Sequence, residues 1–368
     1  MANTLAVRPL PFDPNFEQVP DDEAATTQQL VDTMRSITET TYKDHGHATR
    51  SVHAKSHGLL QGELEVSADL PPELAQGAFA KPGIFPVVMR FSTNPGDILD
   101  DKISVPRGLA VKIIGVAGAR LPGSEANTTQ DFVMIDAPAF ANATPKAFLA
   151  NLKLLAKTTD KAEGFKKTMS AILRGVESAV EAVGGQSGTL MSLGGHPQTH
   201  ILGETFYTSV PFLYGPYFAK LSIAPVSPAL TVLTKAPVDL KDRPDGLREA
   251  VNDFFARQGG EWVVRIQLAT DIDKMPIEDA SVKWPEDESP YVTVARIRVA
   301  PQPAWSEARS VAIEDRLAFS PWNGLAAHRP LGGVMRSRKP AYEMSAQFRG
   351  QANGCPMHEP RVNEPLGE

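Results

Sequence analysis

Cysteine is almost missing from this sequence, because Cys355 is the only one among 368 residues. A single cysteine excludes an internal disulfide framework and fits a reducing cytoplasm. The chain also lacks an apolar run near the ~18–20 residues of a membrane-spanning helix, and it has no run rich in Lys and Arg. Its formal net charge is −6, and its first residues lack the pattern of a secretory signal. We therefore expect a cytoplasmic protein that inserts into no membrane and binds no nucleic acid.

Strand-like segments are present in quantity. Residues alternate in polarity or are β-branched over 59–66, 85–92, 108–115, 131–136, 203–215, 217–226, 261–270 and 291–300. Helical spacing is found over 22–39, with Asp22 as the expected N-cap, and over 144–158, 161–183 and 246–259. About eight alternating strands interrupted by helices predict an α+β fold. We expect a closed antiparallel eight-stranded β-barrel with helical insertions and C-terminal helices.

The chain divides into three parts by composition. Residues 1–44 predict an N-terminal arm followed by a helix, and residues 45–350 predict the barrel domain. Residues 351–368 are polar and contain proline, which is typical of a tail that lies along the surface or is mobile.

The segment HGHATRSVHAKSH, residues 45–57, holds four of the eight histidines. A metal site is one interpretation, but the glycines at 46 and 58 argue against one rigid helix that presents all four imidazoles. Surface histidines near a chain turn are the simpler interpretation for His45, His47 and His57. His196 and His200 are four residues apart, yet Pro197 and the preceding glycines favour a loop there.

Six short motifs follow one another along the chain. They are RSVHAK (50–55), VMRFST (88–93), VPRGLAVK (105–112), ANTTQDFVMID (126–136), AFSP (318–321) and RSRKPAYEMSAQFR (336–349). In this order and spacing the sequence closely resembles the heme-containing catalases, from about Arg50 to Arg349. The resemblance implies a heme buried beside the barrel.

The resemblance assigns four residues to the peroxide-binding side of the heme. His53 matches the distal histidine above the iron, and Ser92 matches the serine that holds its imidazole. Asn127 matches the distal asparagine, and Phe140 matches the phenylalanine that packs on the porphyrin. Without the family pattern, Ser92 would be read as an ordinary strand hydroxyl, Asn127 as a turn asparagine and Phe140 as a core aromatic.

Five further residues are assigned to holding the heme. Tyr342 matches the proximal tyrosine, which binds the iron as a phenolate, with Arg338 four residues earlier. Arg50, Arg90 and Arg349 match the arginines that anchor the two heme propionates. Read alone, Tyr342 would be a half-buried helix tyrosine and Arg338 a solvated helix charge.

Elementary chemistry supports two of these assignments. A phenol has a pKa near 10, so an anionic tyrosine ligand needs a cation nearby, and Arg338 lies one helical turn before Tyr342. Pro340 suits the first turn of a helix, which would place Arg338 just before that helix. Arg90 interrupts the apolar alternation of PVVMRFS, where a charge is costly unless it meets an anion such as a propionate.

The resemblance implies a heme b enzyme that disproportionates hydrogen peroxide to water and dioxygen through an oxoferryl intermediate. In that mechanism His53 transfers the peroxide proton, Asn127 orients the peroxide, and the heme carries the redox chemistry. NADPH binding is not expected, because the chain is shorter than full-size catalases and gives little sign of a nucleotide site. A homo-oligomer is expected.

Three positions bear on the substrate. Val105 stands where catalases usually carry the aspartate of the peroxide channel, and Asn94 stands where a valine narrows that channel. Both changes keep organic hydroperoxides open as substrates, as in a heme peroxidase or a fatty-acid hydroperoxide isomerase similar to allene oxide synthase. Val52 precedes His53, as in true catalases, where the isomerase type has a threonine. A non-catalytic heme-binding module is the third hypothesis.

Overall fold

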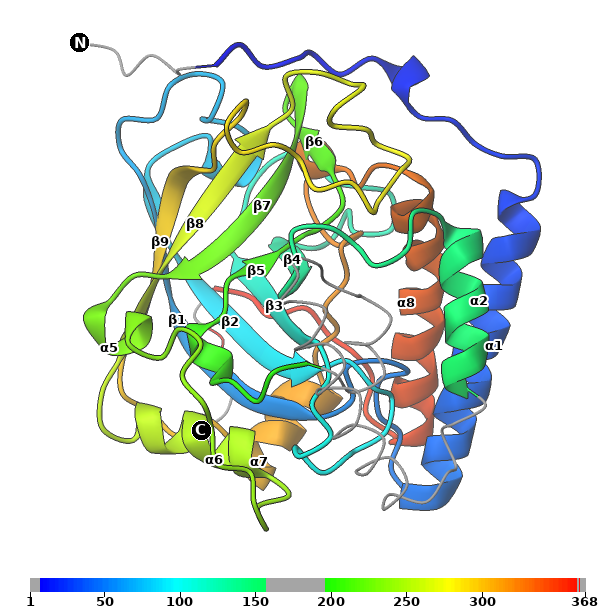
Figure 1. The fold of residues 1–368 in the computed structure, drawn as a ribbon, viewed down its shortest axis with the longest axis vertical. Coiled ribbons are helices and arrows are strands. Elements are labelled where there is room, and N and C mark those ends of the chain that lie inside the picture. Colours follow the sequence, from blue (N-terminus) through cyan, green and yellow to red (C-terminus); the bar gives the residue numbers. More distant parts are fainter. Residues whose placement is uncertain (1–6, 157–195, 363, 365–368) are drawn as a thin grey trace, which may run out of the picture.

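The computed structural model describes residues 7–156, 196–362 and 364. A β-barrel forms one half of the described structure, and a layer of three long helices lies beside it (Figure 1). The helix predicted over 161–183 lies outside the described residues. None of the described helices is both long enough and apolar enough to cross a lipid bilayer.

The barrel is closed and antiparallel, as predicted. Its strands run in the order β5-β4-β3-β2-β1-β9-β8-β7, and a second pairing between β5 and β7 closes a ring of eight. The short strand β6 pairs with β7 at the rim of this ring. The bounds are β1 Ser56–Val66, β2 Gly83–Thr93, β3 Arg107–Ile114, β4 Thr129–Ile135, β5 Phe206–Tyr207, β6 Phe212–Tyr214, β7 Tyr217–Pro225, β8 Gly260–Leu268 and β9 Val292–Val299.

Side-chain alternation fixes which face of each strand meets the barrel interior. On β2, Met89 and Phe91 are fully buried in the central apolar cluster, whereas Arg90 and Ser92 point to the outer wall and line the cavity described below. The interior is filled with large side chains, among them Phe79, Phe132, Phe206, Tyr214 and Trp262. The barrel is therefore a packed core, and any site must lie outside it.

The helix layer consists of α1 (Glu23–His45), α2 (Pro145–Ala156) and α8 (Gly333–Ala352), which stand side by side in Figure 1. Leu30 and Met34 of α1, Leu152 of α2, and Ala341 and Met344 of α8 form one buried apolar cluster. This cluster fixes the position of α8 against α1 and α2, and α8 contains Tyr342, the proximal tyrosine candidate.

Shorter elements lie in the segments between the strands and long helices. They are η1 (Pro14–Phe16), η2 (Gly77–Phe79), η3 (Ile201–Gly203), α5 (Pro228–Thr231), α6 (Gly246–Phe255), α7 (Glu307–Ser310), the π-helical η4 (Val311–Asp315) and η5 (Ala326–His328).

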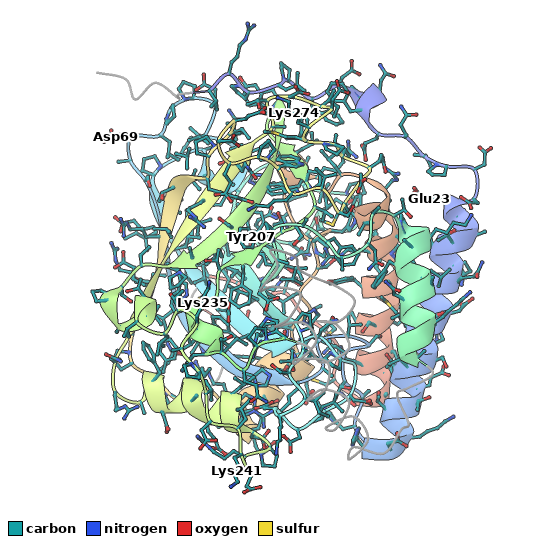
Figure 2. All side chains as sticks on the ribbon, viewed as in Figure 1. Glu23, Asp69, Tyr207, Lys235, Lys241 and Lys274 are labelled. Carbon is teal, nitrogen blue, oxygen red and sulfur yellow. The ribbon has the colours of Figure 1, made fainter. Side chains whose placement is uncertain are left out.

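The N-terminal arm is tied to α8 by charged groups. Arg336 Nε donates to Glu23 Oε1 at 2.7 Å, at the start of α1, where Glu23 is labelled in Figure 2. The same guanidinium donates to Glu17 at 3.0 Å and to Glu278 at 2.9 Å. Burial would lower the pKa of Arg336, but Glu23 and Glu278 outweigh it and raise the pKa. These ion pairs join the arm to α8.

Of two local predictions about helix ends, the N-cap position of Asp22 is confirmed and the placement of Pro340 in a first turn was wrong. Asp22 occupies the N-cap position of α1, but its carboxylate accepts from Lys146 Nζ at 2.7 Å and makes no capping bond to the helix backbone. The helix α8 begins at Gly333, so Pro340 lies inside it and Arg338 belongs to the same helix as Tyr342. Tertiary packing of α8 against α1 and α2 overrides the preference of proline for a first turn.

Two other predictions also need correction. Residues 203–215 do not form one strand, because Ser209 adopts a left-handed backbone with φ of 62° between β5 and β6. His57 is not a surface residue: it lies fully buried at the start of β1, with Nε2 3.1 Å from Thr93 Oγ1. His45 is exposed, and the imidazole of His47 is 2.9 Å from the Asp315 carboxylate.

Candidate active site

A cavity of about 240 Å³ lies between the outer wall of the barrel and the helix α8. The barrel side contributes His53 and Ser92, and α8 contributes Tyr342. The remaining predicted site residues that line the cavity are Asn127, Arg50, Arg90 and Arg349. The structure thus brings seven of the predicted residues, from segments far apart in the sequence, to one cavity.

The backbone at His53 is held in an uncommon conformation. Its φ is 56°, in the left-handed region, which costs a non-glycine residue on the order of 1–3 kcal/mol. The His53 amide donates to the Asn94 carbonyl at 2.7 Å, and Arg90 Nη2 donates to the His53 carbonyl at 2.7 Å. These bonds on both sides of the residue stabilise the strained turn, which aims the imidazole into the cavity.

The imidazole of His53 rests against the β2–β3 ladder. Its Nδ1 lies 3.1 Å from Ser92 Oγ, and Gly108 faces Ser92 across the two strands. A Cβ atom at Gly108 would come within 2.6 Å of the imidazole atoms Cε1 and Nδ1. Only glycine therefore allows the ring to lie this close to the strand.

His53 is neutral at physiological pH. Burial lowers its pKa to about 3, and the positive charges of Arg90, Arg338 and Arg50 contribute to the same shift. A neutral imidazole can accept a proton at one ring nitrogen while the other holds a hydrogen bond. The site therefore presents a base whose unprotonated form is the resting state.

Tyr342 is paired with Arg338 on the same helix. Arg338 Nη2 donates a 2.7 Å hydrogen bond to Tyr342 Oη, and the guanidinium lies 5.2 Å from the centre of the tyrosine ring. This geometry arises from the four-residue spacing, which stacks the two side chains on one helix face. The phenol oxygen of Tyr342 thus accepts a hydrogen bond from a charged donor on its own helix.

One end of the cavity is strongly basic, since Arg50, Arg90 and Arg349 converge there on the single buried carboxylate of Glu314. Arg90 Nε donates to Glu314 Oε1 at 2.7 Å and Arg50 Nη1 donates to the same atom at 3.2 Å. Arg349 Nη1 donates to the Glu314 backbone carbonyl at 2.6 Å. Three guanidinium groups thus face one directly bonded carboxylate, with Asp315 as a weaker neighbour.

The pKa values at the basic end reflect this excess of positive charge. Burial lowers the pKa of Arg349 to about 10, with repulsion from Arg90 as the next cause. Burial would raise the pKa of Glu314, but Arg90, Arg50 and the Ser56 hydroxyl outweigh it and hold the value at about 2. Glu314 is therefore ionised at any physiological pH, and its single negative charge offsets only one of the three arginine charges.

These observations fit a heme. A heme carries two propionate carboxylates, which match the two uncompensated positive charges at the basic end. Arg349 Nε is buried and has no hydrogen-bond partner among the described residues, so it has a donor left for an added anion. A tyrosine side chain is one of the established protein ligands of heme iron.

A polar network, not foreseen from the sequence, lies next to Asn127. Asn127 Nδ2 donates to Asn323 Oδ1 at 2.9 Å, and Asn323 Nδ2 donates to Thr129 Oγ1 at 2.8 Å. Beyond them Lys112 Nζ contacts Asp131 at 2.8 Å and Glu359 at 2.5 Å. The sequence does hold a signal for Lys112, because a charge interrupts the apolar run GLAVKIIG in the way that Arg90 interrupts its own strand.

Arg338 does not line the cavity itself and reaches it only through its bond to Tyr342. Phe140, Val105 and Asn94 do not line the cavity either. Phe140 packs with Val210, Ala280, Val334 and Met335, and its ring is 5.3 Å from that of Phe148. Val105 is buried, and Asn94 contributes its backbone carbonyl to the His53 turn. The porphyrin contact of Phe140 stays a prediction, as does the channel role of the other two positions.

His196 and His200 lie outside the cavity as well. Both are buried in the loop before β5, where His196 Nε2 is 2.8 Å from Asp136 Oδ2. His200 Nδ1 accepts from the Leu202 amide at 3.2 Å.

The fold of this chain is similar to that of solved catalases. A fungal catalase superposes over 97% of this chain and 70% of its own, with a TM-score of 0.60 and 16% identity. Catalase A from Saccharomyces cerevisiae superposes over 99% of this chain and 73% of its own, with a TM-score of 0.58 and 16% identity. A bacterial catalase superposes over 98% of this chain and 68% of its own, with a TM-score of 0.54 and 17% identity. No protein-family profile and no curated protein matches the sequence. At this identity the comparison shows the fold, so the resemblance read from the motifs is confirmed at the level of the catalase scaffold.

Proposed function

We propose that this protein is a heme b catalase that converts hydrogen peroxide to water and dioxygen. The observation that carries the proposal is the convergence on one cavity of a neutral, strained histidine and a tyrosine bonded to arginine. The basic end of the same cavity supplies the charge that two propionates need. None of the three features is explained by packing alone.

In this proposal Tyr342 would hold the heme iron through its phenol oxygen, to which Arg338 donates a hydrogen bond. Arg50, Arg90 and Arg349 hold the propionates, and Arg349 Nε supplies the donor left unpaired among the described residues. When bound, the heme supplies the two-electron redox chemistry and an electron-rich metal centre.

The protein supplies proton transfer and orientation. With the Nδ1 proton of His53 donated to Ser92 Oγ, the Nε2 atom carries a free lone pair. Nε2 takes a proton from one oxygen of hydrogen peroxide and returns it to the other oxygen, which leaves as water. A second peroxide molecule gives up two electrons and two protons and leaves as dioxygen, so two peroxides yield two waters and one dioxygen. Asn127 orients the peroxide by hydrogen bonding.

The decisive experiment measures oxygen release by the heme-reconstituted protein, with hydrogen peroxide and a fatty-acid hydroperoxide in parallel. We expect rapid oxygen release from hydrogen peroxide that falls by more than about 100-fold in His53→Ala. His45→Ala is the matched control, because His45 is an exposed histidine away from the cavity, and it should behave as wild type. Fast consumption of the lipid hydroperoxide with little oxygen would favour a hydroperoxide isomerase instead. Heme binding with no turnover of either substrate would favour a non-catalytic heme protein.

A further inference from the structure

The C-terminal segment after α8 returns to the cavity and inserts a carboxylate. Glu359 lines the cavity, and its side chain is only 19% exposed. It contacts Lys112 Nζ at 2.5 Å, on a lysine that is fully buried on the outer wall of β3. Lys112 also bonds both oxygens of Asp131, which faces it directly across the β3–β4 ladder. A tail residue is thus part of a buried ionic cluster in the barrel wall.

The charges in this cluster are fixed by their neighbours. Burial would lower the pKa of Lys112, but Asp131 and Glu359 outweigh it and raise that pKa, so the lysine is a cation. Burial raises the pKa of Asp131, and Glu359 adds to this effect. An ammonium group only donates hydrogen bonds, so Lys112 requires acceptors from both carboxyl groups.

Three hydrogen bonds arrive at the same oxygen of Glu359. Besides Lys112, Thr129 Oγ1 donates to Glu359 Oε2 at 2.7 Å, and Asn323 Nδ2 approaches it at 3.3 Å. A carboxylate oxygen can only accept, so the single hydroxyl proton of Thr129 must point to Glu359. Toward its other neighbour, Asn323, the Thr129 oxygen can then only act as an acceptor.

The direction of the Thr129 hydrogen bond determines which side-chain atoms of the two asparagines donate and which accept. Asn323 lies 2.8 Å from Thr129 Oγ1 and must place its nitrogen there, because both Thr129 and Glu359 act as acceptors toward it. The side-chain oxygen of Asn323 then faces Asn127. Asn127 must therefore donate to it, and Asn127 Nδ2 lies 2.9 Å from Asn323 Oδ1. The amide of Asn127 is therefore locked in one orientation by a chain of hydrogen bonds that starts at Glu359.

We propose that Glu359 is a positioning residue for the candidate site: through Thr129 and Asn323 it holds the amide of Asn127 in a single orientation toward the cavity. This inference rests on the proposed function, in which Asn127 orients the peroxide. It assigns a role to the tail, which the motif resemblance, ending at Arg349, does not reach.

The test is the variant Glu359→Met, because methionine keeps the length of the side chain but replaces the carboxylate by a thioether, which is only a weak acceptor. In this variant the Thr129 hydroxyl can turn to Asn323, both asparagine amides can flip, and two orientations of Asn127 become accessible. Glu364→Met is the matched control, since it is the same change in the same segment at an exposed residue that contacts His358. Thermal unfolding of each variant checks that the fold is kept.

The readout is the C–O stretching band of carbon monoxide bound to the reduced, heme-reconstituted protein, because this band reports the hydrogen-bonding groups next to the ligand. We expect one band in wild type and in Glu364→Met, and a second or displaced band in Glu359→Met. Peroxide turnover in Glu359→Met should fall about tenfold, the effect of losing about one oriented hydrogen bond. A band in Glu359→Met that matches wild type in position and width overturns the proposal.

A second readout needs no heme. The side-chain NH₂ signals of Asn127 in the ¹H–¹⁵N spectrum of the heme-free protein, assigned from their loss in Asn127→Ala, should be a single pair in wild type. They should shift or double in Glu359→Met and stay unchanged in Glu364→Met. If wild type fails to bind heme, the proposed function fails, while this spectrum still decides the role of Glu359. An unchanged Asn127 signal in Glu359→Met overturns that role.

Discussion

Arg338 and Tyr342 face each other across one turn of α8, with the guanidinium Nη2 donating to the phenol oxygen at 2.7 Å. Removing this donor in Arg338→Ala should weaken heme retention by roughly tenfold to 100-fold, the range for one hydrogen bond to a charged group. Transfer of heme to an excess of apomyoglobin measures the loss rate. Arg35→Ala, an exposed arginine of α1, is the matched control. Equal loss rates in all three proteins would show that Arg338 does not support the tyrosine.

Gly108 controls the position of the His53 ring. Gly108→Ala places a methyl group within 2.6 Å of the imidazole, so the ring must move away from Ser92. We expect peroxide turnover to fall by roughly 100-fold, the effect of misplacing a catalytic group by about 1 Å, with heme binding retained. Gly83→Ala at the start of β2 is the control, because its methyl group would meet only the Phe85 ring at 3.3 Å. Full activity in Gly108→Ala would contradict the close packing of the imidazole on β3.

The pH profile of turnover should reflect the low pKa of His53. A base acts when unprotonated, and burial together with Arg90, Arg338 and Arg50 lowers this pKa to about 3. The rate should therefore be flat from about pH 5 through neutrality and decline only as the pH approaches about 3. Initial rates of peroxide loss in buffers of constant ionic strength test this. An acid limb centred near 6.5, the ordinary pKa of histidine, would mean that the imidazole is not buried as described.

Glu314 should stabilise the heme-free protein by offsetting the three arginines. Its folded-state pKa of about 2 lies below the ordinary value of 4.5, which corresponds to about 3 kcal/mol in the free energy of unfolding. Because the folded-state pKa is depressed, this contribution is complete above about pH 4.5 and is lost as the pH falls toward 2. Urea unfolding of wild type and Glu314→Gln should differ most at neutral pH and converge at low pH. A difference that stays constant with pH would point to a packing effect instead.

Much of the scaffold could be predicted from the sequence. Two-residue alternation located β1 to β4 and β7 to β9 within a few residues, since strands with one face on a packed core show their period directly. The division of residues 203–215 into β5 and β6 could not be foreseen, because it depends on a left-handed serine between them. The full length of α8 was also missed, since its contacts with α1 and α2 override the signal from Pro340.

The site was predictable where a short motif carries it, and unpredictable where distant segments meet. His53, Ser92 and Tyr342 sit in recognisable motifs, and the structure brings them to one cavity. Glu314 and Glu359 gave no local signal, because an isolated glutamate in a helical or tail segment is usually solvated. Their importance arises only from long-range contacts, with Arg90 in one case and with Lys112 in the other.

The filled interior of the barrel has a consequence for how this protein can change. Because aromatic side chains occupy the space enclosed by the strands, the cavity lies on the outside wall and is completed by α8 and by the segments at 122–127 and 318–323. Substitutions in those covering segments alter the shape of the cavity without opening a void in the barrel core. Substitutions in the covering segments can therefore change the substrate range of related proteins while the barrel core, and the stability that it provides, stays the same.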